Sequence, residues 1–301
     1  MNPLVPFIFI VTLLFPTAEL LAGTRTVELQ INGVTALADL VAPEEAPIRN
    51  GVVLVTHGTL AHKDMEIVEA LQAGLAERGI ASLAHTLTLG VDRREGMYDC
   101  GVPHTHRHED ALAEIRAWID WLKKEGAGPI TLLGHSRGGN QVAWFAAEHA
   151  GDDVSRVVLM APATAEPASI AAKNYRQRFN AELDAVLNKA KVAAAGNNKE
   201  MMDLPGFVYC PDTKAQAGSV VSYYGDEPRR DTPSLLPGLK MPTLVIAAAK
   251  DSVMPDVAKR VKPLADDKKI TLEVIEDADH MFLDFYAEDA VELIADFIKP
   301  E

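Results

Sequence analysis

Residues 129–140 read Pro-Ile-Thr-Leu-Leu-Gly-His-Ser-Arg-Gly-Gly-Asn and hold the most informative pattern in the chain. The apolar run 130–133 predicts a short buried strand, and the apolar residues within 142–146 have the spacing of a helix. Between them, residues 134–138 form a G-x-S-x-G pattern around Ser136. The flanking glycines are needed because a Cβ atom would clash in such a tight strand-to-helix turn. The turn would raise the Ser136 hydroxyl clear of the sheet and aim the first N–H groups of the helix at the space in front of it.

Further strands and helices are predicted on both sides of this turn. Near the start, 26–32 and 34–40 read as strands, and the Asn32-Gly33 pair between them favours a two-residue hairpin turn. The rhythm of strand and helix stops between about 163 and 239, where an alanine-rich helical stretch precedes an irregular segment at 205–237. The other predicted strands are 51–56, 80–86, 154–160, 242–249 and 270–275, and the other predicted helices are 67–79, 109–124 and one through 290–297.

From about Thr26 onward, the chain resembles the α/β-hydrolase superfamily, because its G-x-S-x-G turn lies between a strand and a helix. The resemblance implies an α/β-hydrolase fold, with a mostly parallel central sheet flanked by helices and a helical cap inserted before the penultimate core strand. Such caps overlie the nucleophile and shape the substrate pocket; the alternative is a separate domain with its own function. The expected divisions are a signal peptide at 1–23, core at 24–162, the cap at 163–239 and core again at 240–301.

A serine hydroxyl is a poor nucleophile at neutral pH and needs a histidine base that a buried carboxylate orients. The order Ser136, Asp251, His280 matches the Ser…Asp…His order of this superfamily, with Asp251 directly after the strand 242–249. Asp277 and Asp279 are rival acids beside His280, but their short separation from it favours a loop-capping role.

The strand at 51–56 runs into a His57-Gly58 pair. The resemblance implies that the backbone N–H of the next residue, Thr59, and that of Arg137, which follows the nucleophile, form an oxyanion hole. His57 is predicted to fix this loop and to take no part as a base.

The long loop 87–108 contains charged and metal-binding residue types. Its alternating histidines could bind a metal together with Asp110, but no second ligand cluster accompanies them, which favours a polar loop that leads into a helix. Arg93 and Arg94 in the same loop could contact an anionic substrate or be solvated. No metal and no cofactor is expected. The alternating histidines are His104, His106 and His108.

These residues predict acyl transfer by a serine hydrolase, in the manner of a carboxylesterase, on a small-molecule acyl substrate. A thioesterase or a peptidase or amidase would use the same three residues, and a non-catalytic binding protein on the same scaffold is a further alternative. The net charge of −14 in a chain of 301 residues argues against nucleic acid or an anionic membrane surface as a partner.

The first residues and the two cysteines bear on the compartment. The apolar run 4–15 is too short to span a bilayer and fits a secretory signal peptide cleaved near Ala22 or Gly23, so export to the periplasm or the medium is expected, without a stable membrane anchor. An uncleaved N-terminal anchor and a cytoplasmic enzyme remain as alternatives. In an oxidising compartment Cys100 and Cys210 could pair, since the resemblance places both above Ser136; otherwise they are two buried thiols.

Overall fold

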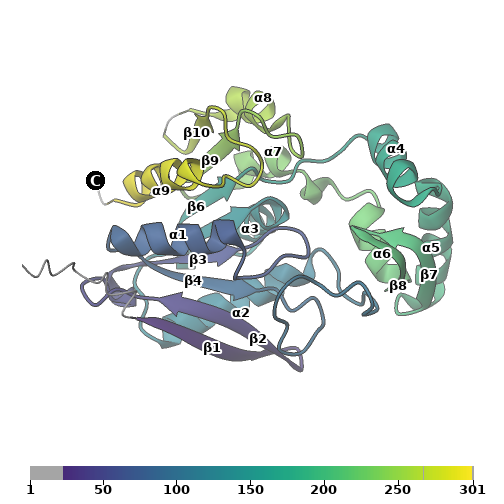
Figure 1. The fold of residues 1–301 in the computed structure, drawn as a ribbon, viewed down its shortest axis with the longest axis horizontal. Coiled ribbons are helices and arrows are strands. Elements are labelled where there is room, and N and C mark those ends of the chain that lie inside the picture. Colours follow the sequence, from purple (N-terminus) through teal and green to yellow (C-terminus); the bar gives the residue numbers. More distant parts are fainter. Residues whose placement is uncertain (1–22, 267, 300–301) are drawn as a thin grey trace, which may run out of the picture.

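The computed structural model describes residues 23–266 and 268–299 and has the expected α/β-hydrolase fold (Figure 1). One sheet has the strand order β1-β2-β4-β3-β5-β6-β9-β10. The hairpin β1–β2 turns at Asn32 and Gly33, as predicted, and pairs antiparallel with β4, while the other strands run parallel. The strands are β1 (Thr24–Ile31), β2 (Val34–Val41), β3 (Val52–Thr56), β4 (Ala81–Thr86), β5 (Ile130–His135), β6 (Val154–Met160), β9 (Thr243–Ala248) and β10 (Ile270–Ile275).

Helices cover both faces of this sheet, because its central strands are apolar on both sides. In β3, Val52 and Leu54 pack into one hydrophobic cluster with α2 (Asp110–Lys124) and α3 (Arg137–Glu148). Val53 and Val55 point the other way, into a cluster with α1 (Glu66–Glu77) and α9 (Phe285–Ile298). Continuous apolar strands are typical of parallel sheets buried between two helical layers. The short elements are α8 (Val257–Val261) and the 3₁₀ helices η1 (Ile48–Asn50), η2 (Gly151–Asp153), η3 (Pro228–Arg230), η4 (Leu236–Gly238) and η5 (Lys262–Leu264).

The insertion between β6 and β9 lies beyond one end of the sheet, as Figure 1 shows, and it is not purely helical. The predicted irregular segment 205–237 overlaps an antiparallel hairpin and a helix instead. Pro205 and Pro211 argue against strands in the sequence, but a two-stranded ribbon tolerates proline at its free edges. Its last part, α7 (Thr232–Leu235), packs its Leu235 into the core cluster. The other elements are α4 (Ala168–Phe179), α5 (Leu183–Asn197), β7 (Met201–Phe207), β8 (Cys210–Gln216) and α6 (Ala217–Tyr224).

The loop 87–108 is part of the same unit as this insertion. His104 forms a parallel bridge with Ala215 of β8, and a disulfide joins Cys100 to Cys210. The expectation of a polar loop was wrong, because His104, His106 and His108 are all buried. The aromatic rings of the insertion cover the first two of them, so the loop gains an apolar environment that its own sequence does not indicate.

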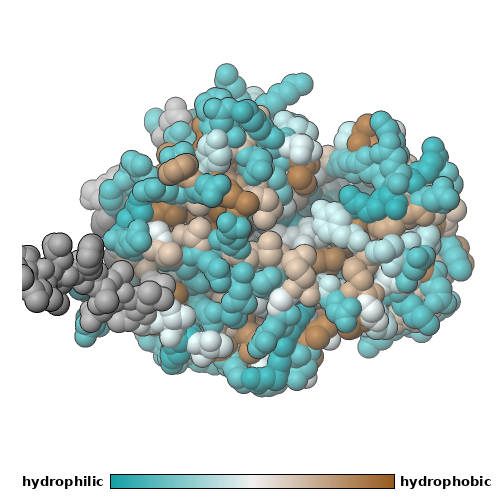
Figure 2. Space-filling model, viewed as in Figure 1, coloured by the Kyte–Doolittle hydropathy of each residue, from teal (hydrophilic) through white to brown (hydrophobic). Residues whose placement is uncertain are grey.

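On the face shown in Figure 2, hydrophilic side chains predominate and apolar ones are scattered. None of the helices within 23–266 and 268–299 is long and apolar enough to cross a membrane. Residues 1–22 of the predicted signal peptide, with the candidate cleavage site at Ala22, lie outside the described residues.

Candidate functional site

Ser136 occupies the turn between β5 and α3 with a strained backbone, at φ 56° and ψ −122°. Positive φ is uncommon for a residue with a Cβ atom and persists only where the surroundings enforce it. The neighbouring glycines allow that close packing. A Cβ on Gly134 would lie 2.4 Å from the Gly138 carbonyl oxygen, and a Cβ on Gly138 would lie 2.3 Å from that of His57. No side chain fits at either position.

The structure brings Ser136, His280 and Asp251 into one hydrogen-bonded row. The Ser136 Oγ lies 2.8 Å from His280 Nε2, and His280 Nδ1 lies 2.7 Å from an Asp251 carboxylate oxygen. The three residues come from three separate turns at the carboxyl ends of β5, β9 and β10. All are buried, with 7%, 9% and 5% of their surface exposed. In this geometry the imidazole can accept a proton from the hydroxyl while the carboxylate holds its other nitrogen.

The turn after β9 holds the Asp251 carboxylate as an anion. Burial raises its pKa, but the hydrogen bonds from His280 and from the N–H groups of Met254 and Val253 outweigh this and leave the pKa below the usual value. Neither rival acid is bonded to the imidazole. Asp279 accepts a hydrogen bond from the Met281 N–H, and the exposed Asp277 pairs with Lys250.

His135 supports this row from the side, a role that sequence reasoning missed. Its Nε2 donates a hydrogen bond of 2.8 Å to the His280 carbonyl oxygen. Burial, and after it the neighbouring His280, lower the pKa of His135 to about 4, so the ring is neutral at pH 7. The only signal in the sequence is the position directly before the serine, which by itself does not indicate a partner.

The loop after β3 runs beside the nucleophile. A Cβ on Gly58 would lie 3.2 Å from the Ser136 Cβ, so the residue before Thr59 packs against the Ser136 side chain. His57 fixes the loop: its Nδ1 donates to the Gly58 carbonyl over 2.8 Å, and its Nε2 accepts from the Leu87 N–H over 2.9 Å. The Arg137 N–H is the first of helix α3 and has no intrahelical acceptor.

Arg94 also holds this loop, whereas Arg93 lies outside the site. The buried Arg94 donates to the carbonyl oxygens of Leu87, Gly96 and Ala61. Burial lowers its pKa to about 10, which leaves the guanidinium charged at pH 7. Arg93 is exposed and pairs with Glu28. Neither arginine of the pair is therefore placed to contact a substrate.

Polar side chains of α3 tie the nucleophile helix to the loop and to the insertion. Asn140 accepts a hydrogen bond of 2.9 Å from His108 Nε2 and donates to the Arg229 carbonyl and the Thr232 hydroxyl. Arg137 donates through Nε to Thr59 Oγ1 over 2.9 Å, and its guanidinium lies 5.1 Å from the ring centre of Tyr223. The insertion is thus anchored directly on the helix that begins at Ser136.

The other buried histidines form a hydrogen-bonded chain. His104 Nδ1 lies 3.0 Å from His106 Nε2, and His106 Nδ1 lies 2.9 Å from the Tyr223 hydroxyl. Burial lowers the pKa of His104 to about 4 and that of His106 well below its usual value, so both rings are neutral at pH 7. Among the described residues, no group of three or more histidine, cysteine, aspartate or glutamate side chains could hold a metal ion.

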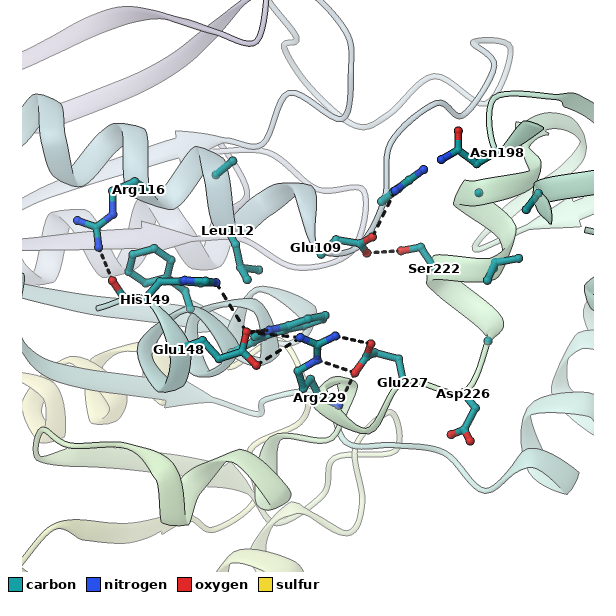
Figure 3. Close-up of a pocket in the computed structure, with 18 of the residues that line it drawn as sticks. Glu109, Leu112, Arg116, Glu148, His149, Asn198, Ser222, Asp226, Glu227 and Arg229 are labelled. Atoms are coloured by element: carbon teal, nitrogen blue, oxygen red, sulfur yellow. Dashed lines mark hydrogen bonds and ion pairs between the residues drawn. The ribbon is translucent and has the colours of Figure 1, made fainter. Parts of the chain in front are cut away.

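A cavity of about 1080 Å³ lies elsewhere, between α2 and α3 on one side and α5 and α6 on the other. Figure 3 shows that charged groups in it are bonded to one another: Arg229 pairs with Glu148 and Glu227, and Glu109 accepts a hydrogen bond from Ser222. None of the three residues in the hydrogen-bonded row lines this cavity. It is a seam between core and insertion.

Comparison with known proteins agrees with the fold. The sequence matches the model of the alpha/beta hydrolase family over residues 34–297, whereas a search of curated proteins finds no significant match. The structure is similar to Est1E from Butyrivibrio proteoclasticus, at 20% identity and a TM-score of 0.63, over 91% of this chain and 97% of that one. The esterase domain of a Rhodothermus marinus protein is 15% identical, with a TM-score of 0.58 over 91% of this chain and 97% of that one. The monoacylglycerol lipase of Paleococcus ferrophilus is 17% identical, with a TM-score of 0.57 over 86% of this chain and 96% of that one.

Because the family model spans most of the chain, the protein belongs to the α/β-hydrolase family. At these sequence identities, the similarity to the three solved structures supports the fold alone.

Proposed function

We propose that this protein is a serine hydrolase that cleaves a carboxylic ester through Ser136, His280 and Asp251. The supporting observation is the continuous row of hydrogen bonds of 2.8 and 2.7 Å that joins these three side chains. A second support is the strained turn that carries Ser136, because strain of this kind persists at functional sites.

The reaction would begin when the Ser136 Oγ attacks the ester carbonyl and His280 Nε2 takes its proton. Asp251 would keep the ring in the tautomer that carries its proton on Nδ1 and stabilise the imidazolium. The N–H groups of Thr59 and Arg137 would bind the oxyanion, which is the largest single stabilisation in such sites. His280 would then protonate the departing alcohol, and water would hydrolyse the acyl-enzyme with His280 again as the base.

Thioesters and amides could enter the same cycle, since they differ in the leaving group and not in the nucleophile. The names of two of the similar structures, an esterase domain and a lipase, make oxygen esters the first substrates to test. A non-catalytic binding protein on this scaffold would not need a serine hydroxyl held 2.8 Å from the Nε2 atom of a histidine.

A fluorophosphonate probe and 4-nitrophenyl esters of graded chain length test the proposal together. Wild-type protein should be labelled and should cleave at least one ester, and Ser136→Ala should lose both, with turnover falling by roughly 10⁴- to 10⁶-fold. Ser169→Ala, on the exposed side of α4, is the matched control and should behave as wild type. Labelling of folded Ser136→Ala would refute the assignment.

Export is proposed on the same footing, and the disulfide between Cys100 and Cys210 supports it, because disulfides persist in oxidising compartments. N-terminal sequencing of protein from a periplasmic extract should begin close to Ala22 or Gly23. A mature protein that starts at Met1 and stays in the cytoplasm would contradict it.

A further inference from the structure

Arg137 carries a positive charge beside the proposed nucleophile, and none of its partners is negatively charged. Its Nε donates to Thr59 Oγ1, and its Nη1 lies 3.3 Å from His108 Nδ1. Its guanidinium also lies over the face of the Tyr223 ring. Among the described residues, no carboxylate lies within 4.0 Å of this guanidinium. Because a guanidinium has five N–H donors, these contacts leave several of them unused on a partly buried group.

Two nearby arginines differ from Arg137, because their terminal nitrogens donate to backbone carbonyl oxygens. Arg94 donates to carbonyl oxygens of the loop 87–108 and of the loop after β3. Arg230 donates through both terminal nitrogens to the carbonyl oxygens of Tyr223 and Gly225. Neither Arg94 nor Arg230 is neutralised by a bonded carboxylate within the part of the chain that the structure describes. The surroundings of Arg137 therefore carry fixed positive charge.

The positive charge around Arg137 also affects the pKa of the neighbouring His108. Burial lowers the pKa of His108 well below its usual value, and the charges of Arg137 and Arg230 lower it further. Three acidic groups of the region have partners other than Arg137: Asp251 binds His280, Glu114 binds Thr88, and Glu109 binds Ser222. In a chain of net charge −14, such a positive site attracts an anionic ligand.

Other arginines of this protein show what a satisfied guanidinium looks like. Arg93 pairs with Glu28, and Arg260 pairs with Asp231. A partly buried charge is costly unless it is paired, and the guanidinium fork matches a carboxylate with two parallel hydrogen bonds. No described carboxylate pairs with Arg137 in this way, and Arg137 lies next to the proposed nucleophile.

We propose that Arg137 binds a carboxylate of the substrate, so that the enzyme prefers esters with a negative charge near the bond that is cleaved. The inference rests on the proposed function of Ser136. Arg137 follows Ser136 directly, and its side chain is bonded to Thr59, so the guanidinium lies beside both predicted N–H donors of the oxyanion hole. The charged group would therefore lie only a few bonds from the reacting carbonyl.

Two pairs of esters test this, because the charge can be on either side of the bond. Mono-4-nitrophenyl adipate and its methyl ester differ in charge on the acyl side, and 4-acetoxybenzoate and its methyl ester differ on the leaving-group side. Wild-type enzyme should cleave the anionic member of at least one pair with the higher kcat/KM, after correction for spontaneous hydrolysis. The preference should weaken as salt is added, since salt screens the attraction.

The ratio of kcat/KM for the two members should fall by about 10- to 100-fold in Arg137→Gln, the usual range for losing a charge-assisted pair. Arg137→Lys should keep part of the preference, because the ammonium retains the charge without the fork. Arg93→Gln removes a charge far from the site and is the control for net charge; its ratio should match that of the wild type.

The outcomes separate this inference from the proposed function. Equal cleavage of both members of both pairs by the wild type, or a preference that survives in Arg137→Gln, would overturn the role of Arg137 alone. Failure to cleave any ester or to react with the fluorophosphonate probe would overturn the serine hydrolase proposal, and this inference with it.

Discussion

The imidazole of His135 donates a hydrogen bond of 2.8 Å to the carbonyl oxygen of His280, across 145 residues of sequence. The residue before the proposed nucleophile thereby holds the loop of the proposed base. The two rings also lie close, with centres 5.0 Å apart. The distance between Ser136 and His280 therefore depends on the turn between β5 and α3 and on this hydrogen bond.

Replacement of His135 should lower turnover without removing any of the three reacting side chains. His135→Leu keeps the volume but not the donor, and kcat should fall by about 10- to 100-fold, because a shift of about 1 Å in a reacting group has this cost. His135→Gln retains an N–H near the position of Nε2 and should restore part of the rate. Equal loss in both variants, at wild-type stability, would show that the hydrogen bond is not what matters.

The two acids near His280 should differ sharply in effect. Asp251→Asn should leave the protein folded and lower kcat by roughly 10⁴-fold, since the imidazole loses its partner and its tautomer. Asp279→Asn should change kcat little, because that carboxylate caps the Met281 N–H. Steady-state kinetics on one ester compare the two, and the reverse order would assign the acid to the His280 loop.

The disulfide between Cys100 and Cys210 should stabilise the protein and restrain the insertion. It closes a loop of 110 residues. Removing it in a Cys100→Ala, Cys210→Ala double variant should lower the free energy of unfolding by about 2–5 kcal/mol. In urea unfolding, the wild type in excess reductant should have the same free energy of unfolding as the double variant. A reduced wild type as stable as the oxidised form would contradict this.

Acid should destabilise the fold through its buried histidines. The pKa of His85 is lowered to about 3 and those of His104 and His135 to about 4, in each case first of all by burial. Burial also lowers the pKa of His57, His106 and His108. Below about pH 6.5 the unfolded chain binds protons that the folded chain does not, so stability falls as the pH drops from about 6.5 to 4, by up to about 1.4 kcal/mol per pH unit for each histidine.

One buried acid acts in the opposite direction. Burial raises the pKa of Glu114 to about 7, although its hydrogen bonds from Thr88 lower it. The contribution of Glu114 to the stability of the fold therefore declines as the pH rises from about 4.5 to 7. The histidines outnumber it, and urea unfolding at pH 7.5, 6 and 5 should show a net loss toward acid. His149→Gln, at an exposed position, is the control and should have the wild-type slope. A flat profile would mean that the histidines are not buried in solution.

The local sequence predicted those elements of the fold that depend on interactions between residues close together in the chain. The alternation of strands and helices, the Asn32-Gly33 turn and the strand-to-helix turn at Ser136 follow from residue periodicity and from backbone sterics, which act over a few residues. The order Ser136, Asp251, His280 predicted through the resemblance to the superfamily that these residues would meet, and the carboxyl ends of parallel strands lie at one edge of a sheet.

Only the tertiary structure decided the surroundings of these groups. Burial of His104, His106 and His108, the contact of His135 with His280, and the unpaired charge of Arg137 all depend on segments far apart in the chain. The pairing of Cys100 with Cys210 depends in the same way on a loop and an insertion that pack together. Burial and proximity are properties of the packed chain, and neither periodicity nor spacing along the sequence determines them.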